Sequence, residues 1–246
     1  MTPKNFLTTV CSAALALVFP ERCQLCRQGH ASPAEGYVCS SCRLRVQPIS
    51  GPSCSRCGLP FHGAITHEFQ CPNCTRIPLA FSRARSAVEA VGPARHAIHL
   101  YKYHRALWLE PFLSDIWLPA ALPDISASPW TGIVPVPLHP VRLREREFNQ
   151  AERLARILAA PLSLPVQPDL VRRCIPTDSQ THLSREQRAA NVRRAFSPVR
   201  SLRLKGTRWI VVDDVLTTGA TTDAVASILR KAGASEVIVW TVARGV

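Results

Sequence analysis

Two adjacent aspartates, Asp213 and Asp214, follow a short apolar run and precede a threonine- and glycine-rich segment. Adjacent carboxylates suit two neighbouring hydroxyl groups, such as the 2′,3′-diol of a ribose, or a Mg²⁺ ion that bridges to that diol. The residues that follow are Thr217, Thr218, Gly219, Ala220 and Thr221. A glycine lets the backbone approach a ligand closely, and N–H groups at the start of a helix bind phosphate. The sequence therefore predicts a sugar-phosphate site in which Asp213 and Asp214 are candidate catalytic and ligand-binding residues.

Other interpretations of this segment compete with a sugar-phosphate site. A strand that ends in two aspartates is also typical of a Walker B strand, but the sequence has no G-x-x-x-x-G-K-[ST] loop. It also has no G-x-G-x-x-G loop before a helix. The remaining alternative is an ordinary strand, turn and helix in which a threonine caps the helix. We favour the sugar-phosphate site because the acids, the glycine and the threonines occur together.

Eight of the ten cysteines form four C-x-x-C pairs that could bind metal. The pairs are Cys23 and Cys26, Cys39 and Cys42, Cys54 and Cys57, and Cys71 and Cys74. The first two pairs have 12 residues between them and the last two have 13, so the same plan occurs twice. Zinc prefers four sulfur ligands at the corners of a tetrahedron, and each pair supplies two of them. The spacing predicts two closed, structural Zn²⁺ sites.

The ligand set of each zinc ion is a separate question. In the simplest assignment the first four cysteines hold one ion and the last four hold the other, whereas a cross-braced pairing stays open. Thioredoxin-like redox chemistry and disulfides are alternative uses of C-x-x-C pairs. The redox motif opens a helix after a strand, whereas turn-forming residues dominate here. We therefore expect structural zinc.

The composition divides the chain into three regions that must position these residues. Residues 1–20 are mainly apolar, and residues 21–78 hold the cysteine pairs with glycine and proline. Residues 79–246 alternate strand-like and helix-like patterns, which is typical of βαβ units. We predict an N-terminal helix over 1–20, a double zinc ribbon over 21–78 and, over 79–246, an α/β domain whose parallel sheet has helices on both faces.

Hydrophobic patterns place elements within the third region. We expect strands at Phe81–Ala90, Gly132–Val136, Trp209–Val212 and Val237–Val242, and helices near Arg95–Trp108, Phe148–Leu158 and Val225–Ala232. The Pro- and Ser-rich segment Pro119–Trp130 predicts a surface loop, and Pro161 should end the second helix. A strand over Trp209–Val212 would place the two acids just beyond its end, where open α/β sheets bind ligands.

The apolar stretch Phe6–Phe19 follows a single lysine and weakly resembles a signal peptide. It is too short to cross a bilayer comfortably, and the first cysteine pair follows almost at once. We expect a buried or amphipathic helix, no membrane span and a cytoplasmic location. A reducing compartment suits thiolate ligands to zinc.

The run Val211–Thr221 resembles the binding motif of type I phosphoribosyltransferases. The resemblance implies that Asp213 and Asp214 hold the ribose hydroxyls and that the residues from Thr217 to Thr221 hold the 5-phosphate. The ligand would be phosphoribosyl diphosphate with Mg²⁺. An earlier loop holds the diphosphate in such enzymes, and Val134–Pro140 with Arg142 and Arg146 occupies the corresponding place. His139 in this loop could act as an acid or a ligand, although a histidine in a proline-rich turn is more often structural.

The cysteine pairs, the sequence V-P-V-P-L-H-P and the aspartate motif together are similar to ComF-type proteins. In that family a double zinc ribbon precedes a phosphoribosyltransferase-like domain, and the match extends over nearly the full chain. Residues Arg146–Gln150 support it, as do further matches at Gly92, Pro93, His99, Lys102, Tyr103, Gln180, Leu183, Arg185, Arg188, Asn191, Ala195 and Phe196. One departure is Glu147, where the family usually has glycine. Its negative charge would lie beside the diphosphate loop.

The resemblance implies a role in competence or DNA uptake with single-stranded DNA and competence proteins as partners. The alternative is a phosphoribosyltransferase that acts on an unidentified small-molecule acceptor. The net charge is +13, and residues 142–208 contain 15 Lys and Arg against 6 Asp and Glu. Such an excess can bind a phosphate backbone nonspecifically, although a diphosphate site plus solvated helix faces would also explain it. Aromatic residues there are too few to indicate base stacking.

Overall fold

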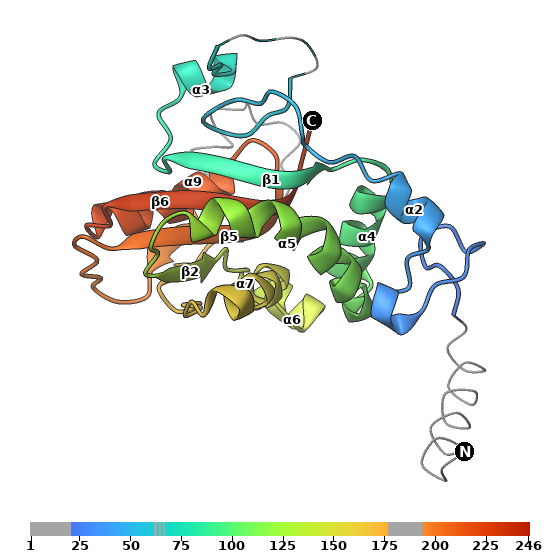
Figure 1. The fold of residues 1–246 in the computed structure, drawn as a ribbon. Helices are drawn as coiled ribbons and strands as arrows, with labels where there is room; N and C mark the ends of the chain where they lie inside the picture. Colours follow the sequence, from blue (N-terminus) through green and yellow to red (C-terminus); the bar gives the residue numbers. More distant parts are fainter. Residues whose placement is uncertain (1–20, 62, 64, 66, 177–193) are drawn as a thin grey trace.

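A computed structural model of the chain describes residues 21–61, 63, 65, 67–176 and 194–246. The predicted helix over 1–20 and the family matches between Gln180 and Asn191 lie outside these residues. The core element is a four-stranded parallel sheet in the order β1-β6-β5-β2 (Figure 1). Its strands are β1 (Arg83–Glu89), β2 (Gly132–Pro135), β5 (Arg208–Leu216) and β6 (Glu236–Arg244). The expected parallel α/β fold is confirmed.

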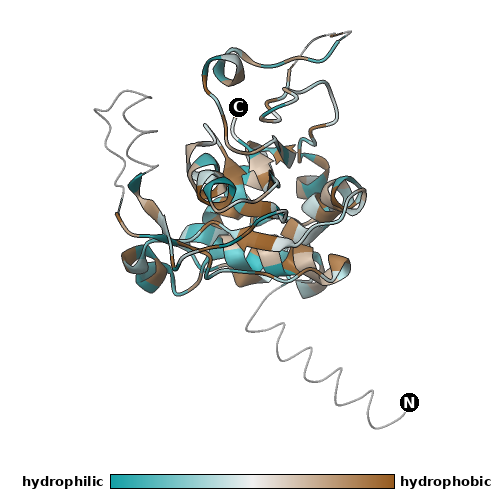
Figure 2. Ribbon diagram, turned by 90° about the vertical axis from the view of Figure 1, so that its left-hand side faces the viewer, coloured by the Kyte–Doolittle hydropathy of each residue, from teal (hydrophilic) through white to brown (hydrophobic). Residues whose placement is uncertain are grey.

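Helices cover both faces of this sheet because successive residues of its central strands point to opposite sides. In β5, Ile210 and Val212 pack in one apolar cluster with α4 (Gly92–Tyr103), α5 (Glu110–Ser126) and α7 (Gln150–Leu162). Trp209 and Val211 pack in a second cluster, which contains α9 (Ala220–Lys231). Apolar segments therefore gather in the sheet between the helices (Figure 2).

Shorter elements complete this domain. They are the 3₁₀ helix η2 (Leu107–Leu109), the helix α6 (Pro140–Arg146), and β3 (Val171–Arg173) paired antiparallel with β4 (Phe196–Pro198). The β3–β4 pair forms a separate sheet from part of the region in which the sequence showed no clear period. Its pairing is between segments of three residues, which is too short for a periodic signal.

The predicted surface loop over Pro119–Trp130 is wrong for most of its length, because α5 continues to Ser126 with Pro119 and Pro123 inside it. A proline inside a helix removes a hydrogen bond and costs about 3 kcal/mol. Burial opposes this cost: Trp117, Ala121 and Ile125 recur every four residues and are at most 1% exposed. The apolar contacts of this face with the sheet keep α5 helical.

Two further boundaries differ from the predictions. Helix α7 passes through Pro161 and ends at Leu162, where Ser163 adopts a left-handed conformation with φ of 52°. Strand β5 continues past Val212 because Asp213 and Leu216 still pair with Thr241 and Arg244 of β6. The two acids therefore lie within the strand, and not beyond its end.

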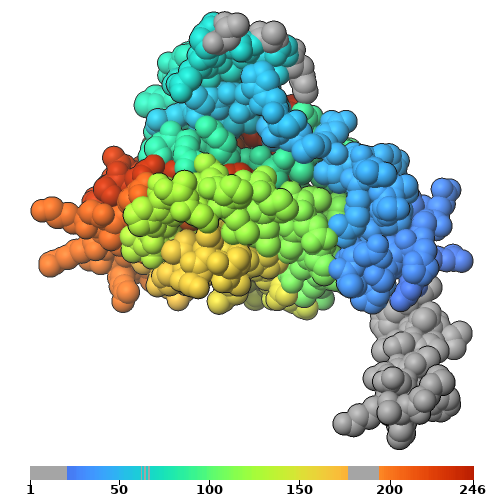
Figure 3. Space-filling view, in the orientation of Figure 1, coloured from blue at the N-terminus to red at the C-terminus, as the bar shows by residue number. Residues whose placement is uncertain are grey.

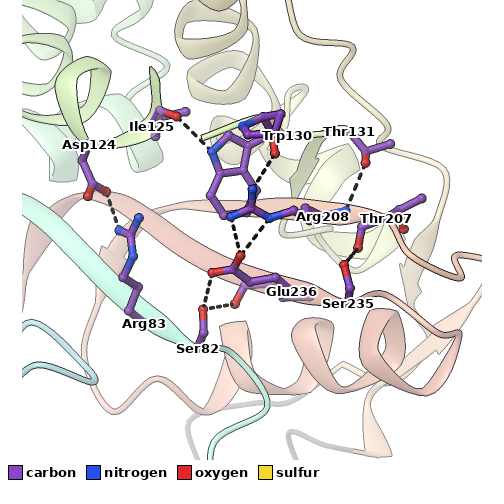
Figure 4. Close-up of polar contacts among 12 residues, drawn as sticks. Ser82, Arg83, Asp124, Ile125, Trp130, Thr131, Thr207, Arg208, Ser235 and Glu236 are labelled. Carbon is purple, nitrogen blue, oxygen red and sulfur yellow. Dashed lines mark hydrogen bonds and ion pairs between the residues drawn. The ribbon is translucent and has the colours of Figure 1, made fainter. Parts of the chain in front are cut away.

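The amino ends of the strands are held by a polar network (Figure 4). Nη2 of Arg208 lies 2.5 Å from Oε2 of Glu236, and Oε1 of the same carboxylate accepts a hydrogen bond from Ser82 at 3.1 Å. The Arg208 guanidinium stacks on the ring of Trp130 at 4.5 Å, and Trp130 donates to the carbonyl of Ile125 at 3.0 Å. These contacts within the chain hold the amino ends of β5 and β6 together.

The cysteine-rich region lies against the edge of β1 and the start of α5 (Figure 3). It contains η1 (Pro33–Glu35), α2 (Ser40–Leu44) and α3 (Pro72–Arg76). Between its two halves, the carbonyl of Gln47 accepts from Glu89 N–H at 2.9 Å and Ile49 N–H donates to Ala87 at 2.9 Å. These bonds cover a strand edge that would otherwise present unpaired backbone groups.

Among the residues that the structure describes, no helix combines the length and the apolar character that a membrane crossing requires.

Candidate functional site

The eight paired cysteines form two clusters, as the simplest assignment predicts. Cys23, Cys26, Cys39 and Cys42 make one, and Cys54, Cys57, Cys71 and Cys74 make the other. Within each cluster the sulfur atoms lie within 4.8 Å of one another. The cross-braced pairing is therefore not adopted.

The cluster geometry fits zinc. Four sulfurs at about 2.3 Å from a central Zn²⁺ in a tetrahedron are about 3.8 Å apart. The observed separations are 3.7 Å for Cys23–Cys42, Cys26–Cys39 and Cys57–Cys71. A disulfide requires about 2.05 Å, and no cysteine in the described ranges forms one. Both clusters are consistent with closed structural sites in which all four ligands come from the protein.

Asp213 and Asp214 lie near the carboxyl end of β5 and are held by the backbone. Oδ1 of Asp213 accepts a hydrogen bond from Asp214 N–H at 2.9 Å, and Oδ1 of Asp214 accepts from Val215 N–H at 3.0 Å. Asp214 is buried at 2% exposure, whereas Asp213 is half-buried. The strand therefore presents two carboxylates in fixed orientations.

The segment after β5 turns into α9 at the same sheet edge. Gly219 has φ of 80°, a left-handed conformation that favours glycine, and it forms the N-cap of α9. Thr218 Oγ1 accepts a long hydrogen bond of 3.4 Å from Ala220 N–H, which caps the helix. Thr217 and Thr221 face the cavity described below. The predicted helix start is therefore present. Of the five predicted residues Thr217–Thr221, two line the cavity.

The loop after β2 reaches the same place. His139 caps α6 by accepting from Val141 N–H at 3.3 Å through Nδ1, so its ring also has a structural role. Arg142 pairs with Glu145 at 3.0 Å. Arg146 donates to Gln150 Oε1 at 2.6 Å. All three of the predicted residues, His139, Arg142 and Arg146, line the cavity.

These elements line one cavity of 720 Å³ at the carboxyl edge of the sheet. Its wall includes the acid pair, Thr217 and Thr221, and the loop from Val136 to Arg146. Thr218, Gly219 and Ala220 do not line it. The predicted sugar-phosphate residues and the predicted diphosphate residues are therefore brought to one hollow, although they are far apart in the sequence.

The sequence analysis assigned no site role to another part of this wall, although His99, Lys102 and Tyr103 are among the family matches. Helix α4 contributes Arg95, His99, Lys102 and Tyr103, and β3 contributes Arg173. Spacing could have signalled the α4 residues, because positions 95, 99 and 103 recur every four residues on one helical face. No comparable signal precedes Arg173, since β3 spans three residues in a segment without a period.

Burial sets the protonation of the polar wall. It raises the pKa of Asp213 to about 6, against the opposing charges of Lys102, Arg173 and Arg146. Burial also lowers the pKa of Lys102, Arg146 and Arg173. Because the arginines stay protonated at neutral pH, the cavity combines fixed cations with an acid that titrates in the weakly acidic range.

Comparisons with known proteins identify the family of this chain. The double zinc ribbon domain matches residues 14–76, and the phosphoribosyl transferase domain matches residues 149–245. The chain is 31% identical over 231 residues to Competence protein F of Haemophilus influenzae, covering 92% of this chain and 98% of that protein. The chain belongs to the ComF family. It is also 33% identical over 235 residues to the DNA utilization protein YhgH of Salmonella typhimurium, covering 93% and 99%.

A more distant member of the ComF family is Competence protein ComFC of Bacillus subtilis, with 28% identity over 215 residues and 84% of each chain covered. The resemblance to this family is thus confirmed, as is the combination of a zinc ribbon with a phosphoribosyltransferase domain. The predicted boundaries at residues 20 and 78 stay predictions.

Glu147 is the residue at which this ComF-family chain departs from the expected glycine. It ends α6 with φ of 68°, a left-handed conformation in which a glycine is free of strain. Its carboxylate lies 3.0 Å from Arg105 and does not line the cavity. The negative charge of Glu147 is therefore paired at the surface. The carboxylate does not contact the cavity that the segment after β2 lines, so it does not conflict with a ligand there directly.

The expected Mg²⁺ does not fit at Oδ2 of Asp214. A Mg²⁺ ion requires oxygen ligands at about 2.0–2.1 Å. Oδ2 of Asp214 instead lies 2.5 Å from the Lys102 ammonium. In this ComF-family protein, a cation from the chain thus occupies the position that a metal held by Asp214 would need.

Proposed function

We propose that this ComF-family protein binds phosphoribosyl diphosphate, or a related sugar phosphate, in the cavity at the carboxyl edge of the sheet. The observation that carries this proposal is that one wall combines the acid pair of β5, the start of α9 and the basic loop after β2. Carboxylates suit ribose hydroxyls, a helix start suits a phosphate and arginine forks suit a diphosphate. The match to the phosphoribosyl transferase domain supports the same ligand class.

The direct test is calorimetry with phosphoribosyl diphosphate on the wild type and on Asp213→Asn. Asp213 is the safer acid to change, because Asp214 is buried against Lys102. We expect the variant to bind at least about tenfold more weakly, since a hydrogen bond to a charged group contributes about 1.5–3 kcal/mol. Asp115→Asn serves as a matched control, because Asp115 pairs with Arg43 away from the cavity. Equal affinity in all three proteins would contradict the proposal.

The same wall supports the alternative of phosphoribosyl transfer to a small acceptor. Loss of the diphosphate requires charge stabilisation at the leaving group, which Arg142, Arg146 and Arg173 could provide from the cavity wall. Release of diphosphate from phosphoribosyl diphosphate in the presence of candidate acceptors tests this activity. Binding without release under all acceptors would favour a binding or regulatory site.

A role with single-stranded DNA in competence or DNA utilization is the cellular part of the proposal, with competence proteins as partners and the reducing cytoplasm as the location. The names of the relatives, which refer to competence and DNA utilization, support it. Exposed basic residues also gather in the segments around the β3–β4 pair. They are Arg172, Arg194, Arg200, Arg203 and Lys205. Basic surface residues attract a phosphate backbone in a salt-dependent way.

Fluorescence anisotropy with a labelled single strand tests this surface. We expect Arg200→Glu with Arg203→Glu to weaken binding and to reduce its salt dependence. Arg156→Glu with Lys231→Glu makes the same change of charge on α7 and α9 and should have a smaller effect. Asp213→Asn should leave DNA binding intact. Equal losses in both double variants would indicate a nonspecific charge effect and would contradict a defined surface.

A further inference from the structure

Lys102 forms an ion pair inside the cavity with one of the two acids. Its Nζ lies 2.5 Å from Oδ2 of Asp214, and the two side chains are 21% and 3% exposed. Lys102 lies in the last turn of α4, whereas Asp214 lies in β5. Both residues line the cavity. The pair is therefore part of the wall that would contact a ligand.

The carboxylate oxygens of the two acids have different partners. Oδ1 of Asp213 and Oδ1 of Asp214 each accept a backbone N–H. Oδ2 of Asp214 is buried, and the ammonium of Lys102 lies 2.5 Å from it. Buried polar atoms nearly always have a hydrogen-bond partner. The ammonium of Lys102 is that partner here, and Asp214 in turn holds the ammonium at the wall of the cavity.

The ammonium beside this oxygen restricts which chemical group of a ligand can bind here. A divalent cation bound to Oδ2 of Asp214 would lie next to the ammonium of Lys102, and like charges repel strongly in a partly desolvated site. A hydroxyl group has no net charge, and it can donate one hydrogen bond while it accepts another. An ammonium has three N–H donors, so Lys102 can keep its ion pair and also donate to the ligand.

We propose that Lys102 and Asp214 together recognise one hydroxyl group of the ribose, with the ammonium in the place of a divalent cation. The hydroxyl accepts a hydrogen bond from Nζ of Lys102, and Asp214 orients this ammonium through the ion pair. This inference rests on the proposed binding of a sugar phosphate. It makes Lys102 a specificity-determining residue, and it predicts that the sugar end binds without Mg²⁺ and rejects a deoxy analogue.

Calorimetry with ribose 5-phosphate tests the inference, because this probe has no diphosphate to bind Mg²⁺. In buffer freed of divalent cations, we expect the wild type to bind with the same affinity as after addition of MgCl₂. Either 2-deoxyribose 5-phosphate or 3-deoxyribose 5-phosphate should bind at least about tenfold more weakly, because a buried polar pair loses its partner. A requirement of the wild type for Mg²⁺, or equal affinity for all three sugars, would overturn the proposal.

The variant Lys102→Met removes the ammonium and keeps Asp214, so it distinguishes the contribution of the lysine from that of the acid. It should lose about tenfold or more in affinity without divalent cations and recover part of it with MgCl₂. Lys231→Met removes an exposed lysine of α9 and should bind as the wild type does. If Lys102→Met is unstable because Asp214 is left unpaired, Lys102→Met with Asp214→Asn restores neutrality and should bind weakly whether or not Mg²⁺ is present. Wild-type affinity in Lys102→Met would overturn the proposal.

A metal titration without any sugar distinguishes failure of this inference from failure of the proposed function. If the wild type binds no sugar phosphate under any condition, the proposed function is wrong. Electron paramagnetic resonance with Mn²⁺ then still tests Lys102. We expect Lys102→Met to gain a Mn²⁺ site that Asp214→Asn removes, whereas the wild type has none. A wild-type Mn²⁺ site that disappears in Asp214→Asn would overturn the assignment of the cation position to Lys102.

Discussion

At the residue scale, the titration of Asp213 links the cavity to stability. An aspartate has a pKa near 3.9 in an unfolded chain, and burial raises the pKa of Asp213 to about 6 in the folded chain. The folded state therefore binds this proton more tightly between about pH 4 and 6. As the pH rises through this window, deprotonation of Asp213 reduces the free energy of unfolding.

We predict that Asp213→Asn becomes more stable relative to the wild type by about 1–2 kcal/mol as the pH rises from 4.5 to 7.5, a range that allows for the partial exposure of the side chain. Urea denaturation at several pH values measures this difference. Because both proteins carry the same cysteines, the effect of pH on the zinc ligands cancels. A difference that stays constant with pH would show that Asp213 titrates as an ordinary aspartate.

Glu147 gives a second prediction at this scale. Its φ of 68° is strained for a residue with a side chain, and its exposed pair with Arg105 contributes at most about 1 kcal/mol. We expect Glu147→Gly to raise the free energy of unfolding by about 0.5–1 kcal/mol in urea titrations. Glu147→Ala removes the same ion pair but keeps the left-handed strain, so it should give no gain. A larger stability of the alanine variant would refute this account.

At the element scale, local patterns predicted more than contacts between distant segments. The zinc clusters follow from C-x-x-C spacing, and each cluster joins cysteines less than 25 residues apart. The contact of Lys102 with Asp214 depends on where the last turn of α4 lies relative to β5, which periodicity does not specify. The end of β5 was also not predictable, because Asp213 stays in the strand through pairing with β6.

The prolines of α5 show that a strong local signal can give a wrong prediction. Pro119 and Pro123 are strong local signals for a loop, and they correctly indicate lost backbone hydrogen bonds. The compensating burial of Trp117 against the sheet is a tertiary effect. Propensity is a weak prior under such packing, and the loop prediction failed for this reason.

Arg244, in the last position of β6, connects three elements at the carboxyl edge. It is 5% exposed, and its Nη1 donates to the carbonyls of Leu216 at 2.9 Å, Thr217 at 2.6 Å and Gly245 at 2.5 Å. Its Nε donates to the carbonyl of Cys57 at 3.3 Å. One guanidinium thus joins the second cysteine cluster to the start of the Thr217–Thr221 segment.

We predict that Arg244→Met lowers the free energy of unfolding by about 3 kcal/mol, because several buried carbonyls lose their donor. It should also weaken the binding of phosphoribosyl diphosphate in calorimetry, since Thr217 loses its support. Arg230→Met is the matched control: Nη1 of Arg230 donates to the carbonyls of Ala234 and Ser235 near the opposite end of the sheet. It should reduce stability and leave affinity unchanged. Unchanged affinity in Arg244→Met would contradict the supporting role.

At the scale of the whole molecule, the two cysteine clusters contact different parts of the α/β domain. The first packs beside α5, where Arg43 pairs with Asp115 at 2.8 Å and lies over the Phe112 ring at 5.2 Å. The second reaches the cavity edge through the Cys57 carbonyl and Arg244. Loss of one zinc ion should therefore have a different effect from loss of the other.

Cys26→Ser and Cys57→Ser test this difference. Metal analysis should give two zinc ions for the wild type and one for each variant, and both variants should lose stability because thiolate–zinc binding contributes to folding. We expect faster hydrogen exchange at Thr217–Thr221 in Cys57→Ser than in Cys26→Ser, since only the second cluster holds Arg244 in place. This measurement needs no ligand, so it is independent of the proposed function. Equal exchange of that segment in both variants would show that the zinc modules stabilise the domain without reaching its cavity.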